Sequence, residues 1–439
     1  MRRLAVGVAL FAISTFSIAG GFAIMEQSVR GLGQSFAGAT TGLGDGSSIF
    51  YNPAALGKQR GRQFGLLGSR IAPSMVFYDQ GSTAIPEIGG FPLPGVPSGD
   101  GGDPAWVPNL YYMSPVGQRM QLGFSINAPY GLASEYEPGW QGRYQALRSE
   151  MLTINANLSL AYRVTDRFSA GFGLSYYKVE TELGNAIDMG SLAFQALGPQ
   201  VATQLGFVPM GTDGAVKVEG DGDAFGFNLG LHYQLTDHTE LALGYKPEVD
   251  IDLAGDAYFT VPQTAIPLTQ MGLFVDDTVT ADITFPEIWS FGLAHRFQRL
   301  TVALDALNVG WSSFQELRIK FDSGQPDAFV DESWKDSWRY ALGFNYIWSK
   351  NLIVRAGYAI DDTPIPDPQH RTPRIPDNDR TWYSAGFTYV MNPNLTIDLA
   401  YADVRSDDTD MENSAGTDLL RGSFELAAEV FSIGFTYRY

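Results

Sequence analysis

The chain of 439 residues contains no cysteine and only four histidines. Without cysteine there is no disulfide framework and no thiolate ligand for a metal. A hydrolase needs a nucleophile beside a base, and the Gly-x-Ser-x-Gly motif is absent, since "GQSFA" at 33–37 lacks the final glycine. We therefore expect no enzyme, with no catalytic residue, no metal site and no cofactor.

Charged residues are also scarce, and those present are mostly acidic. They make up 18% of the chain, with a formal net charge of −19 at pH 7. Nucleic acid is bound through basic surfaces that neutralise its phosphates. The composition therefore argues against nucleic acid as a partner.

Long apolar runs are missing everywhere except at the start of the chain. Arg2 and Arg3 precede the apolar residues 4–16 and the small-residue exit "SIAGG", which is the layout of a secretory signal peptide. The apolar stretch is shorter than the roughly 20 residues that a spanning helix needs. We predict a signal peptide over residues 1–20 and an exported mature chain without a spanning helix.

Glycine and aromatic residues are abundant, with 49 Gly, 28 Phe, 21 Tyr and 8 Trp. Apolar and polar residues alternate with a period of two in many segments, as in "LTINANLSLAYRV" at 152–164, which predicts β-strands. Fourteen such segments occur, at 62–72, 105–115, 118–129, 150–164, 167–182, 223–236, 239–253, 286–298, 300–311, 335–348, 351–361, 380–391, 394–405 and 425–439.

Short and long connections alternate between these segments. Tight turns such as Thr165-Asp166 follow one strand, and loops such as 183–222 follow the next. A soluble β-sandwich would also show period-two alternation. Apolar faces of about 10 residues with aromatics near both ends favour strands that cross a bilayer. We predict an all-β fold, a 14-stranded antiparallel transmembrane barrel over 62–439, in the outer membrane of a Gram-negative bacterium.

A barrel of this width would leak unless something fills its lumen. Residues 21–61 precede the first predicted strand and are rich in glycine, which suits a chain folded in a confined space. A disordered tail is the alternative, but such tails are poor in residues like Phe22, Leu32 and Phe36. We predict that residues 21–61 form a hatch, or plug, inside the barrel.

An ordered series of motifs carries a family resemblance along the mature chain. The series runs through "GGFAIMEQSVRGLGQSFAGA", Asn52-Pro53-Ala54, "AWVPNLYYMSP", "NAPYGLASEY", "FPEIWSFGLAHR", "WKDSWRYALG", "DDTPIPD" and "IPDNDRTWYSAGFTYV". In these motifs the chain resembles the outer-membrane long-chain fatty acid transporter family (FadL type), which also includes importers of aromatic hydrocarbons.

The resemblance implies passive transport of a hydrophobic compound through a lateral opening. In members of the family, an Asn-Pro-Ala element of the hatch lies beside a kink in the third strand, and the ligand leaves through that kink. The resemblance implies this role for Asn52-Pro53-Ala54. The matching strand segment is Asn127, Ala128, Pro129, Tyr130 and Gly131. Independently, Pro129 cannot donate a ladder hydrogen bond and Gly131 lacks packing, so pairing should weaken here.

The resemblance also implies ligand capture between two outer loops, which correspond to 130–149 and 183–222. The second loop carries apolar residues at near-helical spacing, and an exposed apolar helix is unusual unless it packs against or binds something apolar. These residues are Ile187, Leu192, Phe194, Leu197 and Val201.

A carboxylate head group would need a cation in the lumen. The positions at which family members carry head-group-binding basic residues fall near Asn185 and Val330, and neither is basic. Either Arg339, Arg355 or Lys335 takes this role, or the ligand is a neutral hydrocarbon. Strand parity also places Lys246 and Arg163 in the lumen with several acids, which would equally suit a salt-bridge network.

The expected partners are therefore a long-chain fatty acid or another hydrophobic small molecule, together with outer-membrane lipids and lipopolysaccharide, around a monomeric barrel. The main alternative is a general diffusion porin for small polar solutes.

Overall fold

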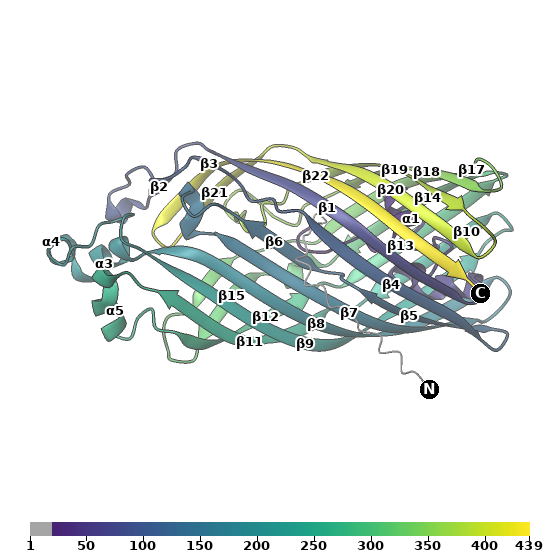
Figure 1. Cartoon of the computed structure of the whole chain (residues 1–439), viewed down its shortest axis with the longest axis horizontal. Helices are drawn as coiled ribbons and strands as arrows, with labels where there is room; N and C mark the ends of the chain where they lie inside the picture. The colour runs from purple at the N-terminus through teal and green to yellow at the C-terminus, as the bar shows by residue number, and fades with distance from the viewer. Residues whose placement is uncertain (1–19) are drawn as a thin grey trace, which may run out of the picture.

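The computed structural model describes residues 20–439, so the predicted signal peptide lies outside the described residues except for Gly20. Within this range, fourteen long strands form a closed antiparallel barrel, because each pairs with the next and β22 pairs with β1 from Gln63↔Arg438 to Asp79↔Gly422 (Figure 1). The predicted fourteen-stranded fold is confirmed. The strands are β1 (Gln63–Asp79), β4 (Ala105–Val116), β5 (Met120–Asn127), β7 (Arg148–Arg163), β8 (Phe168–Asp188), β9 (Asp213–Gln234), β10 (Thr239–Lys246), β13 (Ile288–Phe297), β14 (Leu300–Val309), β17 (Ser337–Ile347), β18 (Leu352–Asp361), β19 (Arg380–Val390), β20 (Leu395–Ser406) and β22 (Asp418–Arg438).

Proline corrects the predicted bounds of two strands. The segment predicted as one strand over 239–253 is interrupted by Pro247-Glu248, which separates β10 from β11 (Val249–Thr260). The third strand, predicted to reach 129, ends at Asn127 before Pro129. Proline has no N–H for the ladder and restricts the residue before it, so regular pairing stops at both places.

Shorter strands extend the wall beyond the long strands at one end of the barrel. Figure 1 shows several of them at the end that carries the long loops. In residues 20–439 they are β2 (Thr83–Ala84), β3 (Ser98–Asp100), β6 (Gly131–Glu135), β11, β12 (Asp277–Phe285), β15 (Glu316–Phe321), β16 (Ala328–Asp331) and β21 (Thr409–Ala415).

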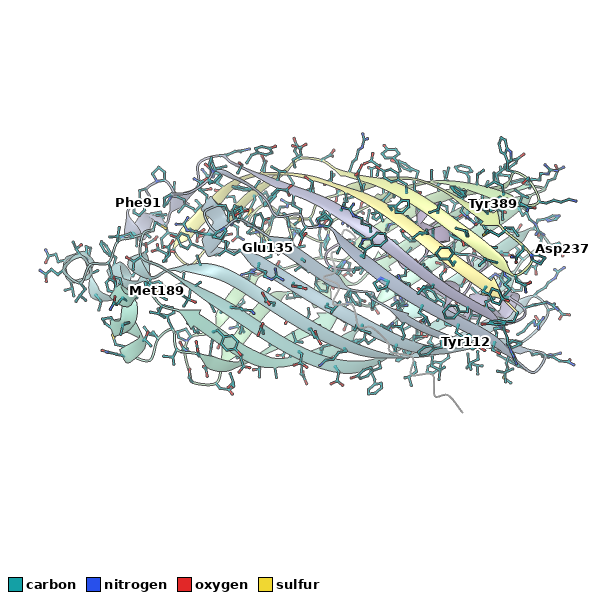
Figure 2. The ribbon with its side chains drawn as sticks, viewed as in Figure 1. Phe91, Tyr112, Glu135, Met189, Asp237 and Tyr389 are labelled. Carbon is teal, nitrogen blue, oxygen red and sulfur yellow. The ribbon has the colours of Figure 1, made fainter. Side chains whose placement is uncertain are left out.

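The two ends of the barrel differ in their connections. The C-terminus and tight turns such as Gln298-Arg299 lie at one end, while α3, α4 and α5 lie at the other (Figure 1). In Figure 2, Asp237 marks the short-turn end and Met189 the long-loop end. The loop helices are η2 (Pro86–Ile88), η3 (Gln141–Tyr144), α3 (Met189–Leu197), α4 (Pro199–Gln204), η4 (Gln263–Ala265), α5 (Ile266–Gln270) and η5 (Trp311–Ser313). Across residues 20–439, no helix has the length and apolar character to cross a membrane.

The barrel is apolar outside and polar inside. On β7, Leu158 is 52% exposed, whereas its neighbours Asn157 and Ser159 are 4% and 0% exposed. This is the reverse of a soluble sandwich, in which the apolar face is the buried one. Exposed aromatic side chains lie toward both ends of the strands, as interfacial girdles do; they include Tyr162, Tyr233, Tyr389 and Tyr437 near the short turns and Tyr176, Phe225, Tyr340 and Tyr383 farther up.

The N-terminal part of the chain lies inside the barrel. Residues 20–61, here named the N-terminal segment, contain α1 (Val29–Leu32), α2 (Ser48–Tyr51) and η1 (Pro53–Lys58). Leu32, Ile49 and Leu56 of this segment are fully buried in the main hydrophobic core. The core of the barrel is thus formed by the N-terminal segment and the inner faces of the strands.

Candidate functional site

Asn52, Pro53 and Ala54 form a cap that starts η1. Asn52 is extended, and its side-chain oxygen accepts a hydrogen bond from the Ala54 amide at 2.9 Å. Pro53 fits the first position of the turn because it needs no N–H there. The Asn52 amide donates to the carbonyl of Thr40 at 2.9 Å and to that of Leu231 on β9 at 3.1 Å. The motif therefore ties the N-terminal segment to β9.

The strands that surround the N-terminal segment present glycine to it. A Cβ on Gly357 would lie 2.1 Å from the backbone carbon of Gln34, and one on Gly171 would lie 2.3 Å from the Ala54 nitrogen. Neither backbone atom can yield without a shift of the chain, so these positions exclude any side chain. Further glycines lie against the segment in the same way: Gly230, Gly244, Gly292, Gly343 and Gly386.

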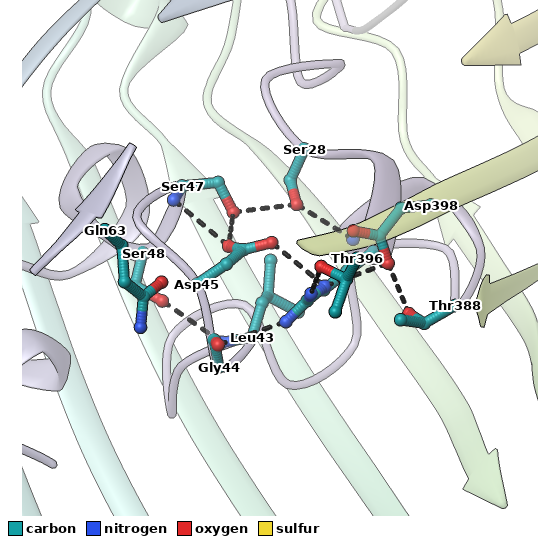
Figure 3. Close-up of polar contacts among 12 residues, drawn as sticks. Ser28, Leu43, Gly44, Asp45, Ser47, Ser48, Gln63, Thr388, Thr396 and Asp398 are labelled. Carbon is teal, nitrogen blue, oxygen red and sulfur yellow. Dashed lines mark hydrogen bonds and ion pairs between the residues drawn. The ribbon is translucent and has the colours of Figure 1, made fainter. Parts of the chain in front are cut away.

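A buried charge cluster adds polar contacts between the segment and the wall. The Arg30 Nε lies 3.1 Å from Asp45 Oδ2 and 3.0 Å from Asp398 Oδ1 on β20. Figure 3 shows Asp45 and Asp398 in one hydrogen-bonded cluster with Ser28, Ser47 and Thr396. Buried charges need such partners, because burial removes most of their hydration.

The wall is interrupted between β5 and β6. Ala128, Pro129 and Tyr130 separate these strands, which both pair with β7. We name this interval the strand break. It coincides with the predicted weak point at residues 127–131.

The start of the N-terminal segment fills the strand break. The Ile24 amide donates to the Pro129 carbonyl at 2.8 Å, and the Gly131 amide donates to the Phe22 carbonyl at 2.9 Å. Ala23 and Tyr130 form an antiparallel bridge. The expectation that Asn52-Pro53-Ala54 lies beside this break is corrected, because residues 22–24 make the contact and Asn52 bonds to β9.

Aromatic rings beside the strand break separate two cavities in the lumen. Tyr130 stacks on Phe285 with ring centroids 3.9 Å apart, and the Phe22 ring lies 6.1 Å from Tyr130 and 4.6 Å from Trp311. We name Phe22, Tyr130 and Phe285 the aromatic partition. Phe22 lines a cavity toward the long loops, and Tyr130 lines a pocket toward the short turns.

The first of these, the outer cavity, is mostly apolar. Leu132, Leu183 and Ile319 are among its lining residues. Its charged lining residues are Arg374, Glu150, Glu219, Asp282 and Glu332. An apolar cavity with a few polar groups is typical of a binding site for a hydrophobic ligand.

Arg374 has no carboxylate partner within residues 20–439. Its Nη1 donates to the Arg148 carbonyl at 3.1 Å and to Ser149 Oγ at 2.9 Å, and its Nη2 donates to Asn185 Oδ1 at 3.1 Å. Burial lowers the pKa of Arg374 to about 10, which leaves it cationic at neutral pH. Asn185, the first unmatched family position, thus holds an arginine from another loop.

Glu332 is the buried one among the acidic residues that line the outer cavity. Burial raises the pKa of its carboxyl from 4.5 to about 8, against the smaller effect of Trp334, whose Nε1 donates to Oε2 at 3.0 Å. The group therefore carries a proton for part of the time near neutral pH.

The three cations predicted for a head group lie elsewhere. Arg339 is buried over the Phe36 and Trp382 rings and donates to the Ser35 carbonyl at 3.1 Å. Arg355 donates to Thr388 Oγ1 at 2.7 Å, beside the Arg30 cluster. Lys335 is exposed. None of these three residues lines the outer cavity. Arg374, which does line it, was not predicted as a site residue. Its stretch "HRTPRIPDNDR" lies beside two motifs that carry the family resemblance, and this position could have identified it.

The outer-loop helices pack on a different loop from the one expected. Ile187, Phe194 and Leu197 join a cluster with Ala265 and Leu268 of the 261–274 loop. The expected partner loop, 130–149, contacts only the base of the 183–222 loop, where Arg143 Nε lies 3.0 Å from Asp213. Of the other predicted residues, Leu192 is half-buried and Val201 is 47% exposed.

Several relatives are known from sequence. The long-chain fatty acid transport protein of Escherichia coli O6:H1 (strain CFT073) is 30% identical over 99% of this chain and 98% of its own length. Outer membrane protein P1 of Haemophilus influenzae is 29% identical over 88% of this chain and 85% of its own length.

Solved structures share the fold. A Pseudomonas aeruginosa FadL homologue superposes with a TM-score of 0.87 at 25% identity, covering 95% of this chain and 99% of that one. The P. putida toluene transporter TodX superposes with a TM-score of 0.69 at 21% identity, covering 94% and 99%, a likeness that concerns the fold alone. The family profile described as outer membrane protein transport protein (OMPP1/FadL/TodX) matches residues 10–439. This chain is an outer-membrane protein and belongs to the OMPP1/FadL/TodX family of transport proteins.

Proposed function

We propose that this protein is a passive outer-membrane transporter of long-chain fatty acids. The observation that carries the proposal is Arg374, a cation without a carboxylate partner in residues 20–439, at the wall of the mostly apolar outer cavity. Its guanidinium would bind the fatty acid carboxylate, and the apolar lining would hold the acyl chain. The long loops face outward and the short turns face the periplasm, as in other bacterial barrels.

Ligand capture begins on the outer-loop helices. Val201, Leu205 and Val208 are 47%, 47% and 56% exposed, and Met271 of the neighbouring loop is 66% exposed. Exposed apolar side chains gathered at one tip favour contact with a hydrophobic compound.

Release is proposed to be sideways, through the strand break, with the N-terminal segment as the hatch. An acyl chain in water costs about 0.8 kcal/mol per CH₂, so a route into the membrane avoids a cost of many kcal/mol. The break is occupied by residues 22–24, which are joined to it by two backbone hydrogen bonds. Movement of these residues would open the wall while the rest of the hatch stays in place.

A disulfide across the break tests the release route. Ala23 and Tyr130 are bridge partners, and the Cα atoms of such partners lie about 4.5–5.5 Å apart, within disulfide range. We expect the oxidised double-cysteine variant to lose uptake of radiolabelled oleate by cells and the reduced form to recover it. Full uptake by the oxidised form would contradict the lateral route.

Neutral aromatic hydrocarbons are the second candidate ligand class, favoured by the apolar lining of the outer cavity and by the fold shared with TodX. Uptake of toluene by an Arg374→Met variant that no longer takes up oleate would support this class. Large steady ion conductance of the intact protein in planar bilayers would instead support a general porin.

A further inference from the structure

Lys246 is a lumen cation beyond the aromatic partition. It is the last residue of β10 and precedes the Pro247 that interrupts the wall. Two residues before it, Gly244 faces the Tyr51 carbonyl of the N-terminal segment, so parity directs Lys246 inward as well. Its Nζ lies 3.5 Å from the centre of the Phe50 ring.

Lys246 has no anion beside it among residues 20–439, in contrast to several other lumen cations. Lys58 pairs with Glu240, Arg30 with Asp45 and Asp398, and Arg380 with Asp361 at 3.1 Å. Within residues 20–439, Lys246 Nζ has no ion pair and no hydrogen bond, and its one charge-related contact is the Phe50 ring. The contact with a ring face contributes less free energy than the hydration that an ammonium loses in an apolar site. The position would be stabilised by an anion that the chain does not supply.

The space around Lys246 suits an acyl chain. The pocket below the aromatic partition, here named the inner pocket, is mostly apolar. Ile24, Phe50 and Leu307 are among its apolar lining residues, and Pro129 and Tyr130 place the strand break in its wall. A ligand in this pocket would therefore lie directly beside the proposed exit.

We infer that Lys246 and Phe50 form a second carboxylate site, in which the ammonium holds the head group of a fatty acid while its chain lies in the inner pocket. This inference rests on the proposed function. The outer site at Arg374 and the inner site at Lys246 lie on opposite sides of the aromatic partition. A carboxylate that passes from one cation to the other is not left uncompensated in apolar surroundings, where an unpaired charge is costly.

A photoreactive fatty acid with a diazirine next to its carboxyl group tests the inference on the intact mature protein in lipid nanodiscs. We expect mass spectrometry to find adducts on the peptides that contain Phe50 or Lys246, and excess oleate to suppress them. In Lys246→Met these adducts should fall about tenfold or more, as expected for the loss of one hydrogen bond to a charged group. Lys246→Arg should retain them, and Lys335→Met serves as the control because Lys335 is exposed.

Two outcomes would overturn the inner site while the proposed function stands: adducts of equal yield in Lys246→Met, or equal labelling by the matching diazirine alcohol, each with oleate uptake intact in cells. The absence of both labelling and oleate uptake in the wild-type protein would overturn the proposed function and this site together. Heat-modifiable gel mobility of each variant checks that the barrel has folded.

Discussion

Arg30 is the residue that fixes the N-terminal segment to β20. Besides its two carboxylate partners, its Nη1 donates to the Gly44 carbonyl at 3.0 Å and its Nη2 to Thr396 Oγ1 at 3.2 Å. The Asp398 side chain is only 3% exposed, so a broken pair would leave a carboxylate buried without its partner. Removal of one member of such a pair is more destabilising than the net contribution of the pair itself.

Arg30→Met should therefore lower the free energy of unfolding by about 3–5 kcal/mol. Urea unfolding of the refolded barrel in lipid vesicles measures the change. The matched control is Arg421→Met, which breaks the exposed pair with Glu412 and should cost about 0–1 kcal/mol. Equal effects of the two substitutions would show that the Arg30 cluster does not hold the segment in place.

We expect Glu332 to make ligand binding in the outer cavity dependent on pH. Its pKa is raised by burial, so the folded state favours the neutral carboxyl. That preference is fully present below the unfolded value of about 4.5 and is lost as the pH rises through about 8. Arg374 stays cationic over this interval because its pKa is about 10. Above about pH 8, an ionised Glu332 would compete with a ligand carboxylate for Arg374.

We expect oleate affinity to fall between about pH 6.5 and pH 9 in the wild-type protein, and to fall less in Glu332→Gln. Equilibrium binding of labelled oleate at the two pH values measures both proteins. The Gln variant also accounts for the titration of oleate itself. The same decrease in both proteins would exclude Glu332 as the cause.

At the scale of elements, the N-terminal segment and the strands fit each other through backbone contact. Gly357 on β18 lies against Gln34 of the segment, and Gly343 on the neighbouring strand β17 lies against Ala37. Side chains on these strands would hold the segment away from the wall and leave a gap. Glycine at these positions is therefore required for the segment to lie against the wall as it does.

Gly357→Ala should destabilise the protein by about 1–3 kcal/mol, because the added methyl overpacks a backbone contact. Displacement of the segment should also raise ion conductance in planar bilayers. Gly65→Ala is the control, since a Cβ there would meet its nearest atom at 3.8 Å, an ordinary contact. Unchanged conductance and stability in Gly357→Ala would mean that the segment adapts without loss of the seal.

At the scale of the whole molecule, the two faces of the barrel wall lie in different environments. The outer face, with side chains such as Leu158, faces lipid. The inner face contacts the N-terminal segment, which supplies partners for polar groups in the lumen. Asp305 on β14, for example, accepts hydrogen bonds from the backbone amides of Gly38 and Thr40 at 2.5 Å and 3.0 Å. The segment is therefore part of the structural core.

Leu158→Arg should destabilise the folded barrel by about 2–4 kcal/mol, because it places a charge on the lipid face near mid-membrane. Val116→Arg, at the end of β4 beside a short turn, should cost only about 0–1 kcal/mol, since it lies near the interface. Refolding into lipid vesicles, followed by denaturant titration, compares the two. A larger effect at Val116 would contradict this placement of the membrane.

The sequence by itself determined the barrel and its lipid face, because period-two alternation decides which side chains of a strand are exposed. It also located the weak point at Pro129, since the missing N–H is a local property. Only the tertiary structure decided what fills that point: Gln27 donates to the Ala128 carbonyl from 101 residues away. It also decided that Arg374 and Lys246 stand beside apolar cavities and that Arg339, Arg355 and Lys335 do not. Contacts between distant segments depend on the packing of the segment inside the barrel, and no local pattern encodes that packing.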